Sequence, residues 1–139
     1  MILLDTNVIS EFMGPAPDRQ VARWLDLQPR SSVWTTAINV YEIRSGLFRM
    51  PAGKRRTALE VKFEQVLQGA LQGRILHFDS DAAFRAAELC GDRHRRGRQV
   101  DVRATMIAGI VLASNATLAT RNVKHFEDIA KSVVNPWEA

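Results

Sequence analysis

Short apolar runs alternate with helical patterns along the whole chain. Residues 1–4, 32–36, 75–78, 117–120 and 133–134 are apolar or β-branched, as is typical of short buried strands. Segments with apolar residues at helical spacing follow these runs, beginning near residues 6, 18, 37, 57, 79 and 102. Strands that alternate with helices predict an α/β fold in which helices cover a mostly parallel sheet.

Two of the predicted helices have the most regular patterns. Residues 57–72 place Leu59, Phe63, Val66, Leu67 and Leu71 on one face, and residues 102–114 carry a second apolar series. Breaks in the pattern coincide with Gly14 to Pro17 and with the pair Pro51 and Gly53. There is no repeat and no interdomain linker, so residues 1–139 are expected to form one domain.

The composition narrows the class of protein without identifying it. Of 139 residues, 46% are hydrophobic and 24% are charged, which is typical of a globular domain. No apolar run approaches the ~20 residues of a membrane span, and we expect no secretory leader. The single cysteine, Cys90, excludes an internal disulfide framework and favours the cytoplasm; its helical context predicts a buried structural thiol rather than a nucleophile.

The positive charge is concentrated in two clusters. The formal net charge is +4, which is compatible with a nucleic acid or with an acidic protein partner and does not choose between them. One cluster is residues 54–56, and the other is Arg93, Arg95, Arg96 and Arg98 around His94. Each cluster is either a solvated helix end or a phosphate contact.

Polar residues follow three of the predicted strands, where parallel sheets build their sites. Asp5 comes directly after the first run, Glu42 lies in the helix after the second, and Asn122 follows the run at 117–120. Taken alone, Asp5 suits a helix cap and Glu42 an exposed helix position. Together, two carboxylates and an amide at one sheet edge suit Mg²⁺ or Mn²⁺, which can activate water for phosphate hydrolysis.

Other chemistries find little support in the sequence. There is no phosphate-cradling glycine loop, and the CxxC, HExxH and GxSxG motifs are absent. The three histidines, His77, His94 and His125, have no ligand spacing and are expected to be structural or at the surface.

Several segments in order resemble PIN-domain ribonucleases, and most of all the toxins of VapBC-type toxin–antitoxin pairs, including FitB-like proteins. The matching segments are residues 2–11 (ILLDTNVISE), 36–46 (TAINVYEIRSG), 106–108 (MIA), 118–126 (LATRNVKHF) and 135–137 (NPW). The resemblance implies a three-layer α/β/α sandwich, a homodimer in the bacterial cytoplasm, and acidic residues that bind Mg²⁺ or Mn²⁺. It also implies RNA as substrate, often tRNA or rRNA, and inhibition by an antitoxin. Asp5 and Glu42 match the first two acidic positions, and Asn122 matches a fourth position that accepts Asp or Asn.

The third acidic position departs from the family pattern. The pattern places an aspartate three residues before the pair Ile107 and Ala108, where this chain has Ala104. Either a catalytic aspartate has been replaced, on purpose, in a protein that would otherwise be toxic, or a natural variant recruits Asp101 one helical turn earlier. Asp101 also suits an N-cap of the helix at 102. We favour the replaced aspartate and expect a well-folded chain with little activity.

Three functions compete on this evidence. The leading hypothesis is a metal-dependent endoribonuclease toxin, with Arg44, Arg121 and Lys124 as candidate RNA contacts. An alternative is a non-catalytic PIN-like module that binds an antitoxin or RNA, which Ala104 would favour. A doubly wound signalling domain that holds Mg²⁺ is the third, and the segment at 120–122 argues against it.

Overall fold

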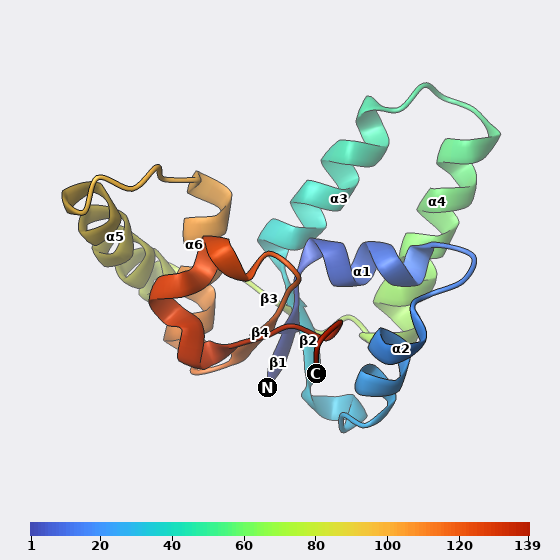
Figure 1. Ribbon diagram of the computed structural model, residues 1–139. Coiled ribbons are helices and arrows are strands. Elements are labelled where there is room, and N and C mark those ends of the chain that lie inside the picture. Colours follow the sequence, from blue (N-terminus) through green and yellow to red (C-terminus); the bar gives the residue numbers. More distant parts are fainter.

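A five-stranded parallel sheet forms the centre of the molecule (Figure 1). The computed structural model describes all 139 residues. The strand order is β3-β2-β1-β4-β5. The strands are β1 (Ile2–Leu4), β2 (Val33–Thr36), β3 (Ile75–Leu76), β4 (Thr117–Ala119) and β5 (Val133–Val134). The prediction of a parallel sheet is confirmed.

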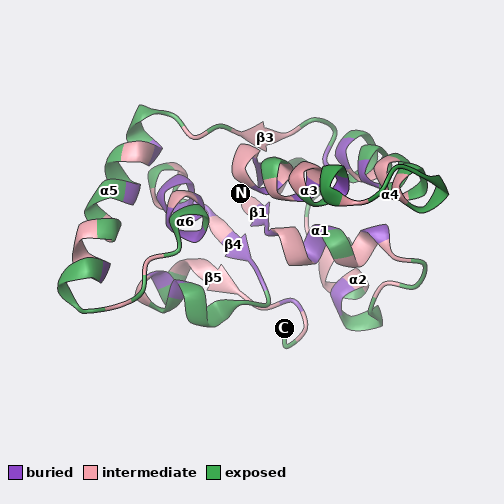
Figure 2. Cartoon of the chain, turned by 90° about the horizontal axis from the view of Figure 1, so that it is seen from above, coloured by how far each residue is buried: buried purple, intermediate pink, exposed green.

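Helices cover both faces of the sheet, as the three-layer sandwich requires. The α-helices are α1 (Thr6–Met13), α2 (Arg19–Asp26), α3 (Ala37–Arg49), α4 (Lys54–Gln65), α5 (Ser80–Arg95) and α6 (Val102–Ser114). A π-helical segment, η2 (Val66–Ala70), continues α4, and two 3-10 segments are η1 (Arg30–Ser32) and η3 (Val123–Ser132). Figure 2 shows α5 and α6 on one side of the strands and α1–α4 on the other.

Two hydrophobic cores fill the space between these layers. Leu4 belongs to the core under α1, α3 and α4, whereas its neighbour Leu3 belongs to the core under α6. Successive residues of a strand face opposite sides of the sheet, so a strand buried on both faces needs an unbroken apolar run. The unbroken apolar run at residues 1–4 is therefore explained by the central position of β1, which is buried on both faces.

The strand order brings three strand ends together. β1 pairs with β2 on one side and with β4 on the other, all three in parallel. After β1 the chain adds β2 and β3 toward one edge of the sheet, and it then crosses over to add β4 and β5 toward the other edge. Such a reversal of strand order opens a crevice at the carboxyl ends of the strands. Residues that directly follow β1, β2 and β4 consequently meet at this edge.

Two details differ from the sequence predictions. The helix expected at 57–72 begins at Lys54, because basic residues 54–56 favour helix but carry no apolar signal. The prediction of a buried Cys90 is wrong, since the residue is exposed. The face of α5 that α6 covers runs through Ala82, Ala86 and Arg93, and Cys90 lies to one side of it. No helix combines the length and apolar character needed to cross a membrane.

Candidate active site

Asp5 lies at the centre of the edge where the three strands end. It directly follows β1 and is 6% exposed. Its Oδ1 accepts hydrogen bonds from the Thr6 backbone N–H at 2.9 Å and from Asn39 Nδ2 at 2.7 Å. Its Oδ2 accepts one from the Thr120 hydroxyl at 2.6 Å. A buried carboxylate is tolerated where such donors surround it, and here the donors lie on the segments that follow β1, β2 and β4.

Glu42 faces the same edge from α3. The Thr6 hydroxyl donates to Glu42 Oε1 at 2.8 Å, and Asn39 Nδ2 donates to the Thr6 hydroxyl at 3.0 Å. Burial raises the pKa of Glu42 above its usual 4.5, the hydrogen bond from Thr6 lowers it, and the charge of Asp5 raises it further. Two carboxylates thus share one partly buried site, an arrangement typical of functional sites.

Four residues that organise the site were not assigned a role from the sequence. Asn39 and Thr120 are fully buried polar residues, and Thr36 donates to Asn39 Oδ1 at 2.6 Å. Asn7 donates to the Thr120 hydroxyl at 3.2 Å and accepts from the Arg121 backbone N–H at 3.1 Å. A sequence signal did exist for Asn39, which precedes Glu42 by three residues and therefore shares its helix face.

Position 104 lines the same hollow as these carboxylates. A cavity of about 250 Å³ has Asp5, Glu42, Ala104 and Asn122 among its lining residues. Ala104 is 8% exposed and presents only a methyl group there. Asn122 is anchored by its backbone N–H, which donates to the Thr120 hydroxyl at 3.0 Å. The residues singled out at all four family positions therefore meet around one cavity.

Asp101 is both a helix cap and a neighbour of this cavity. Its Oδ1 accepts from the Ala104 backbone N–H at 3.0 Å, so it caps α6 as the sequence suggested. It also belongs to the cavity lining. Nevertheless, no three His, Cys, Asp or Glu side chains anywhere in the structure are grouped so as to hold a metal ion.

The candidate RNA-binding residues differ in whether their side chains already contact other residues of the chain. Arg44 forms an ion pair with Glu64 and lies over the Phe63 ring, 4.7 Å from its centroid. Arg121 lies over the Trp137 ring at 4.9 Å. Lys124 is exposed and forms no ion pair.

The second basic cluster contains one residue that neither sequence interpretation fits. Arg93 is 3% exposed, and its guanidinium forms two hydrogen bonds to Asp128, at 2.7 and 2.8 Å. It also donates to the Thr105 hydroxyl and to the His125 carbonyl, both at 3.0 Å. Arg93 is therefore a buried structural residue, and neither a solvated helix end nor a free phosphate contact. All three histidines are exposed, as expected.

Comparison with known proteins settles the family. The PIN domain model matches residues 2–132. The chain belongs to the PIN-domain family. It is 41% identical to the VapC ribonuclease Y4jK of Sinorhizobium fredii over 99% of both chains, and 36% identical to the Toxin FitB of Neisseria gonorrhoeae over 99% of both chains. A crystal structure of FitAcB from Neisseria gonorrhoeae superposes with a TM-score of 0.88 at 35% identity, covering 100% of each chain. The PIN fold expected from the sequence is therefore confirmed.

Proposed function

We propose that this PIN-domain chain is the toxin of a toxin–antitoxin pair, built as a metal-dependent endoribonuclease and impaired by Ala104. The observation that carries the proposal is the common cavity of Asp5, Glu42 and Ala104 at the carboxyl ends of the parallel strands. Two similar proteins are named as a VapC ribonuclease and as a toxin, which supports the same function here.

The residues present suit a hard divalent cation. Asp5 Oδ2 accepts only one hydrogen bond, from Thr120. Glu42 Oε2 accepts no hydrogen bond and lies 3.7 Å from Arg103 Nε, in a half-exposed ion pair that a bound cation would replace. The raised pKa of Glu42 reflects burial of its charge and repulsion from the charge of Asp5. A cation between the two carboxylates would stabilise the charged form of both. Oxygen donors of this kind suit Mg²⁺ or Mn²⁺.

In this proposal Asp5 and Glu42 hold the ion, and Asn122 offers an amide oxygen beside them. When bound, the ion would activate water and stabilise charge on a scissile RNA phosphate. Asn39 and Thr120 fix the Asp5 carboxylate by hydrogen bonds at 2.7 and 2.6 Å, so its oxygens keep one orientation. The Thr6 hydroxyl does the same for Glu42.

Ala104 removes an anionic ligand from this set. Ala favours helix and leaves α6 intact, so the chain folds but holds the ion weakly. Asp101 is the substitute that the cavity offers, although one of its oxygens already caps α6. If neither position serves, the chain is a non-catalytic PIN module that binds an antitoxin or RNA.

The expected partners follow from the same proposal. The substrate is RNA, with tRNA or rRNA as the class implied by the family resemblance, and Arg44, Arg121 and Lys124 stay predicted contacts. The protein partner is a cognate antitoxin, the partner implied by the family resemblance. Residues 1–139 act as one domain, in a homodimer in the bacterial cytoplasm.

The test is cleavage of labelled RNA by this chain and by Ala104→Asp, each with Mg²⁺ and with EDTA. We expect Ala104→Asp to cleave about 100-fold faster or more, a scale known for single preorganised catalytic groups, and only with the metal. Ala104→Asn is the matched control, because it adds a side chain of similar size without the charge. Asp5→Asn in the Ala104→Asp background should abolish cleavage.

Two results would contradict parts of the proposal. If neither protein cleaves RNA with metal, the endoribonuclease function is wrong. If this chain cleaves as fast as Ala104→Asp, position 104 is not the missing ligand. Asp101→Asn then identifies the substitute, since Asn still caps the helix but carries no charge.

A further inference from the structure

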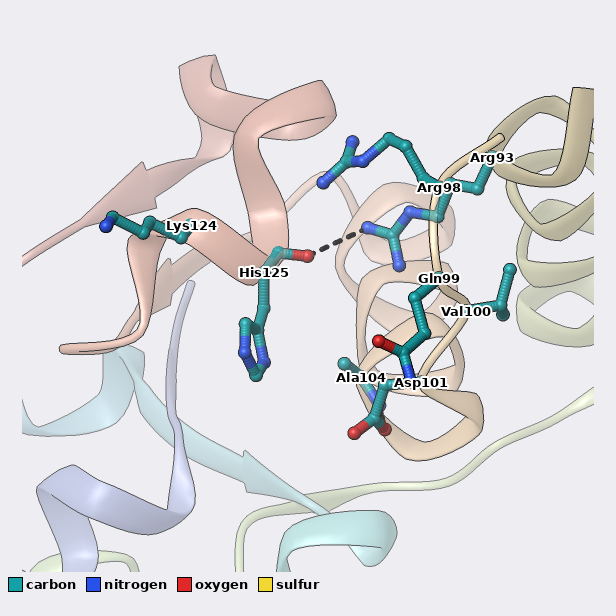
Figure 3. A pocket seen from close by; sticks show the side chains of 8 residues that line it. All are labelled: Arg93, Arg98, Gln99, Val100, Asp101, Ala104, Lys124 and His125. Atoms are coloured by element: carbon teal, nitrogen blue, oxygen red, sulfur yellow. Dashed lines mark hydrogen bonds between the residues drawn. The ribbon is translucent and has the colours of Figure 1, made fainter. Parts of the chain in front are cut away.

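A second, larger cavity adjoins the acidic one. Its volume is about 420 Å³, and it lies between the loop that joins α5 to α6 and the start of η3 (Figure 3). Asp101, Ala104 and His125 line both cavities, so the two are neighbours along one surface. The remaining charged groups of the second cavity are all cationic: Arg93, Arg98 and Lys124.

One buried carboxylate serves two arginines at this cavity. Asp128 forms the paired hydrogen bonds with Arg93, and Arg98 Nη1 lies 3.5 Å from the same Asp128 Oδ2. The hydrogen bond from Arg93 holds the pKa of Asp128 below its usual 3.8, with the charges of Arg93 and Arg98 adding to the effect. Two guanidinium groups and one carboxylate leave one uncompensated positive charge, and no other acidic side chain pairs with Arg98.

Arg93 and Arg98 differ in how many of their guanidinium N–H groups already have a hydrogen-bond partner. The Arg93 guanidinium donates to Asp128, Thr105 and the His125 carbonyl, the last drawn as a dashed line in Figure 3. Arg98 forms no hydrogen bond through its side chain beyond its 3.5 Å approach to Asp128, and this side chain is 31% exposed. The N–H groups of Arg98 are therefore available to a ligand in the cavity.

We infer that this cavity is a second RNA subsite, in which Arg98 binds a phosphate next to the one that enters the acidic cavity. The inference rests on the proposed function. A guanidinium presents N–H groups in a fork that matches phosphate oxygens. A chain with repeated phosphates can occupy both cavities at once, because they share walls. Lys124 stands at the rim, with its ammonium directed away from the arginines in Figure 3, and can reach the chain outside the cavity.

From these contacts we expect that Arg98 can be changed without unfolding the protein. Removal of Arg98 leaves Arg93 and Asp128 as a balanced, hydrogen-bonded pair. Arg98→Gln therefore removes the uncompensated charge, and Arg98→Lys keeps the charge but loses the fork. Arg85→Gln is the matched control, since Arg85 is an exposed arginine of α5 outside both cavities.

The test is binding of a fluorescein-labelled 2′-O-methyl RNA 12-mer in EDTA, measured by anisotropy. EDTA removes the metal ion that the proposed cleavage requires, so binding is measured apart from catalysis. We expect Arg98→Gln to weaken binding about tenfold, the scale of a charged hydrogen bond. The slope of log K against log salt concentration should become about 0.7 less negative, as expected for the loss of one phosphate contact. The affinity of Arg98→Lys should lie between those of the parent chain and Arg98→Gln. Arg85→Gln should change the affinity less than about twofold. Inorganic phosphate should compete only weakly, because it fills one subsite.

Several outcomes would overturn the inference. Equal effects of Arg98→Gln and Arg85→Gln would mean that only net charge matters. Competition by inorganic phosphate as effective as that by RNA would make the cavity a small-anion site. Weaker binding of the antitoxin with unchanged RNA binding would make it a protein-docking surface. In each case Ala104→Asp would still cleave RNA if the proposed function is right, so the two failures are distinguishable.

Discussion

At the scale of single residues, a cap and a ligand need not be alternatives. Asp5 accepts the Thr6 backbone N–H at the start of α1 and also faces the acidic cavity. Asp101 likewise caps α6 and lines the cavity. The cap uses one oxygen of each carboxylate; the other oxygen of Asp101 accepts no hydrogen bond, and that of Asp5 accepts one, from Thr120. A capping carboxylate can therefore also serve a site when its second oxygen lines a cavity.

Glu42 gives a prediction for the dependence of stability on pH. Its raised pKa means that the folded chain binds a proton more readily than the unfolded chain, so unfolding becomes easier as pH rises above about 4.5. Glu42→Gln removes this effect. We expect it to raise the urea midpoint at pH 7 in EDTA and to flatten the pH profile between pH 4 and 7.

The control for this prediction is Glu127→Gln, an exposed carboxyl of η3. It should leave both the midpoint and the profile close to those of the parent chain. A Glu42→Gln chain that is less stable than the parent at pH 7 would show that its hydrogen bond with Thr6 outweighs the cost of burying the charge.

At the scale of elements, α6 places position 104 and depends on close contact with α5. A Cβ atom added at Gly109 would lie 2.5 Å from the Ala82 carbonyl oxygen and 2.7 Å from Ala86 Cβ. Real side chains do not approach so closely, so the two helices would have to separate. The glycine lets α5 and α6 pack together, and this packing holds the N-terminus of α6 at the cavity.

Gly109→Ala should therefore destabilise the fold by about 1–3 kcal/mol, the usual cost of overpacking. Gly46→Ala in α3 is the matched control, because a Cβ there meets no atom within 4 Å. It should stabilise the chain by about 0.5–1 kcal/mol through helix propensity. Thermal unfolding followed by circular dichroism separates the two, and equal melting temperatures would refute the packing argument.

The pair of Arg93 and Asp128 connects three elements of the same region. It joins α5 to η3, and the Arg93 guanidinium also reaches Thr105 of α6. Arg93→Met alone leaves the buried Asp128 without its two hydrogen bonds and with only the longer 3.5 Å contact to Arg98, and should cost about 3–5 kcal/mol. The double variant Arg93→Met with Asp128→Leu should recover most of that loss.

Chemical denaturation of the two variants measures this difference. A double variant as unstable as Arg93→Met alone would mean that the contacts of Arg93 with Thr105 and His125 matter more than the buried charge. Recovered stability would assign the loss to the buried carboxylate of Asp128, left without its hydrogen bonds.

At the scale of the whole molecule, the sheet fixes where chemistry can occur. The central strand β1 has neighbours on both sides, and their carboxyl ends form one edge. The apolar runs and helical spacings were enough to predict a mostly parallel sheet covered by helices, because burial on both faces of such a sheet leaves a strong pattern, but they did not predict the strand order. The positions of Asp5, Glu42 and Asn122 after their strands then followed from topology.

Other features could not be predicted because they depend on contacts between distant segments. The burial of Arg93 requires Asp128, which lies 35 residues away, and neither residue signals the pair by itself. The exposure of Cys90 depends on which face of α5 meets α6. The roles of Asn39 and Thr120 appear only when β1, β2 and β4 lie side by side, since their partner is Asp5.

Calorimetric titration with Mn²⁺ measures whether an aspartate at position 104 would complete the proposed metal site. The chain and its Ala104→Asp variant are compared, with Asp5→Asn in each as the control for binding at the cavity. We expect Ala104→Asp to bind Mn²⁺ at least about tenfold more tightly than the chain, since even outer partners of metal sites have effects of that size. We also expect Asp5→Asn to weaken binding in both. Equal affinities of the chain and Ala104→Asp would mean that position 104 is not a metal-ligand position.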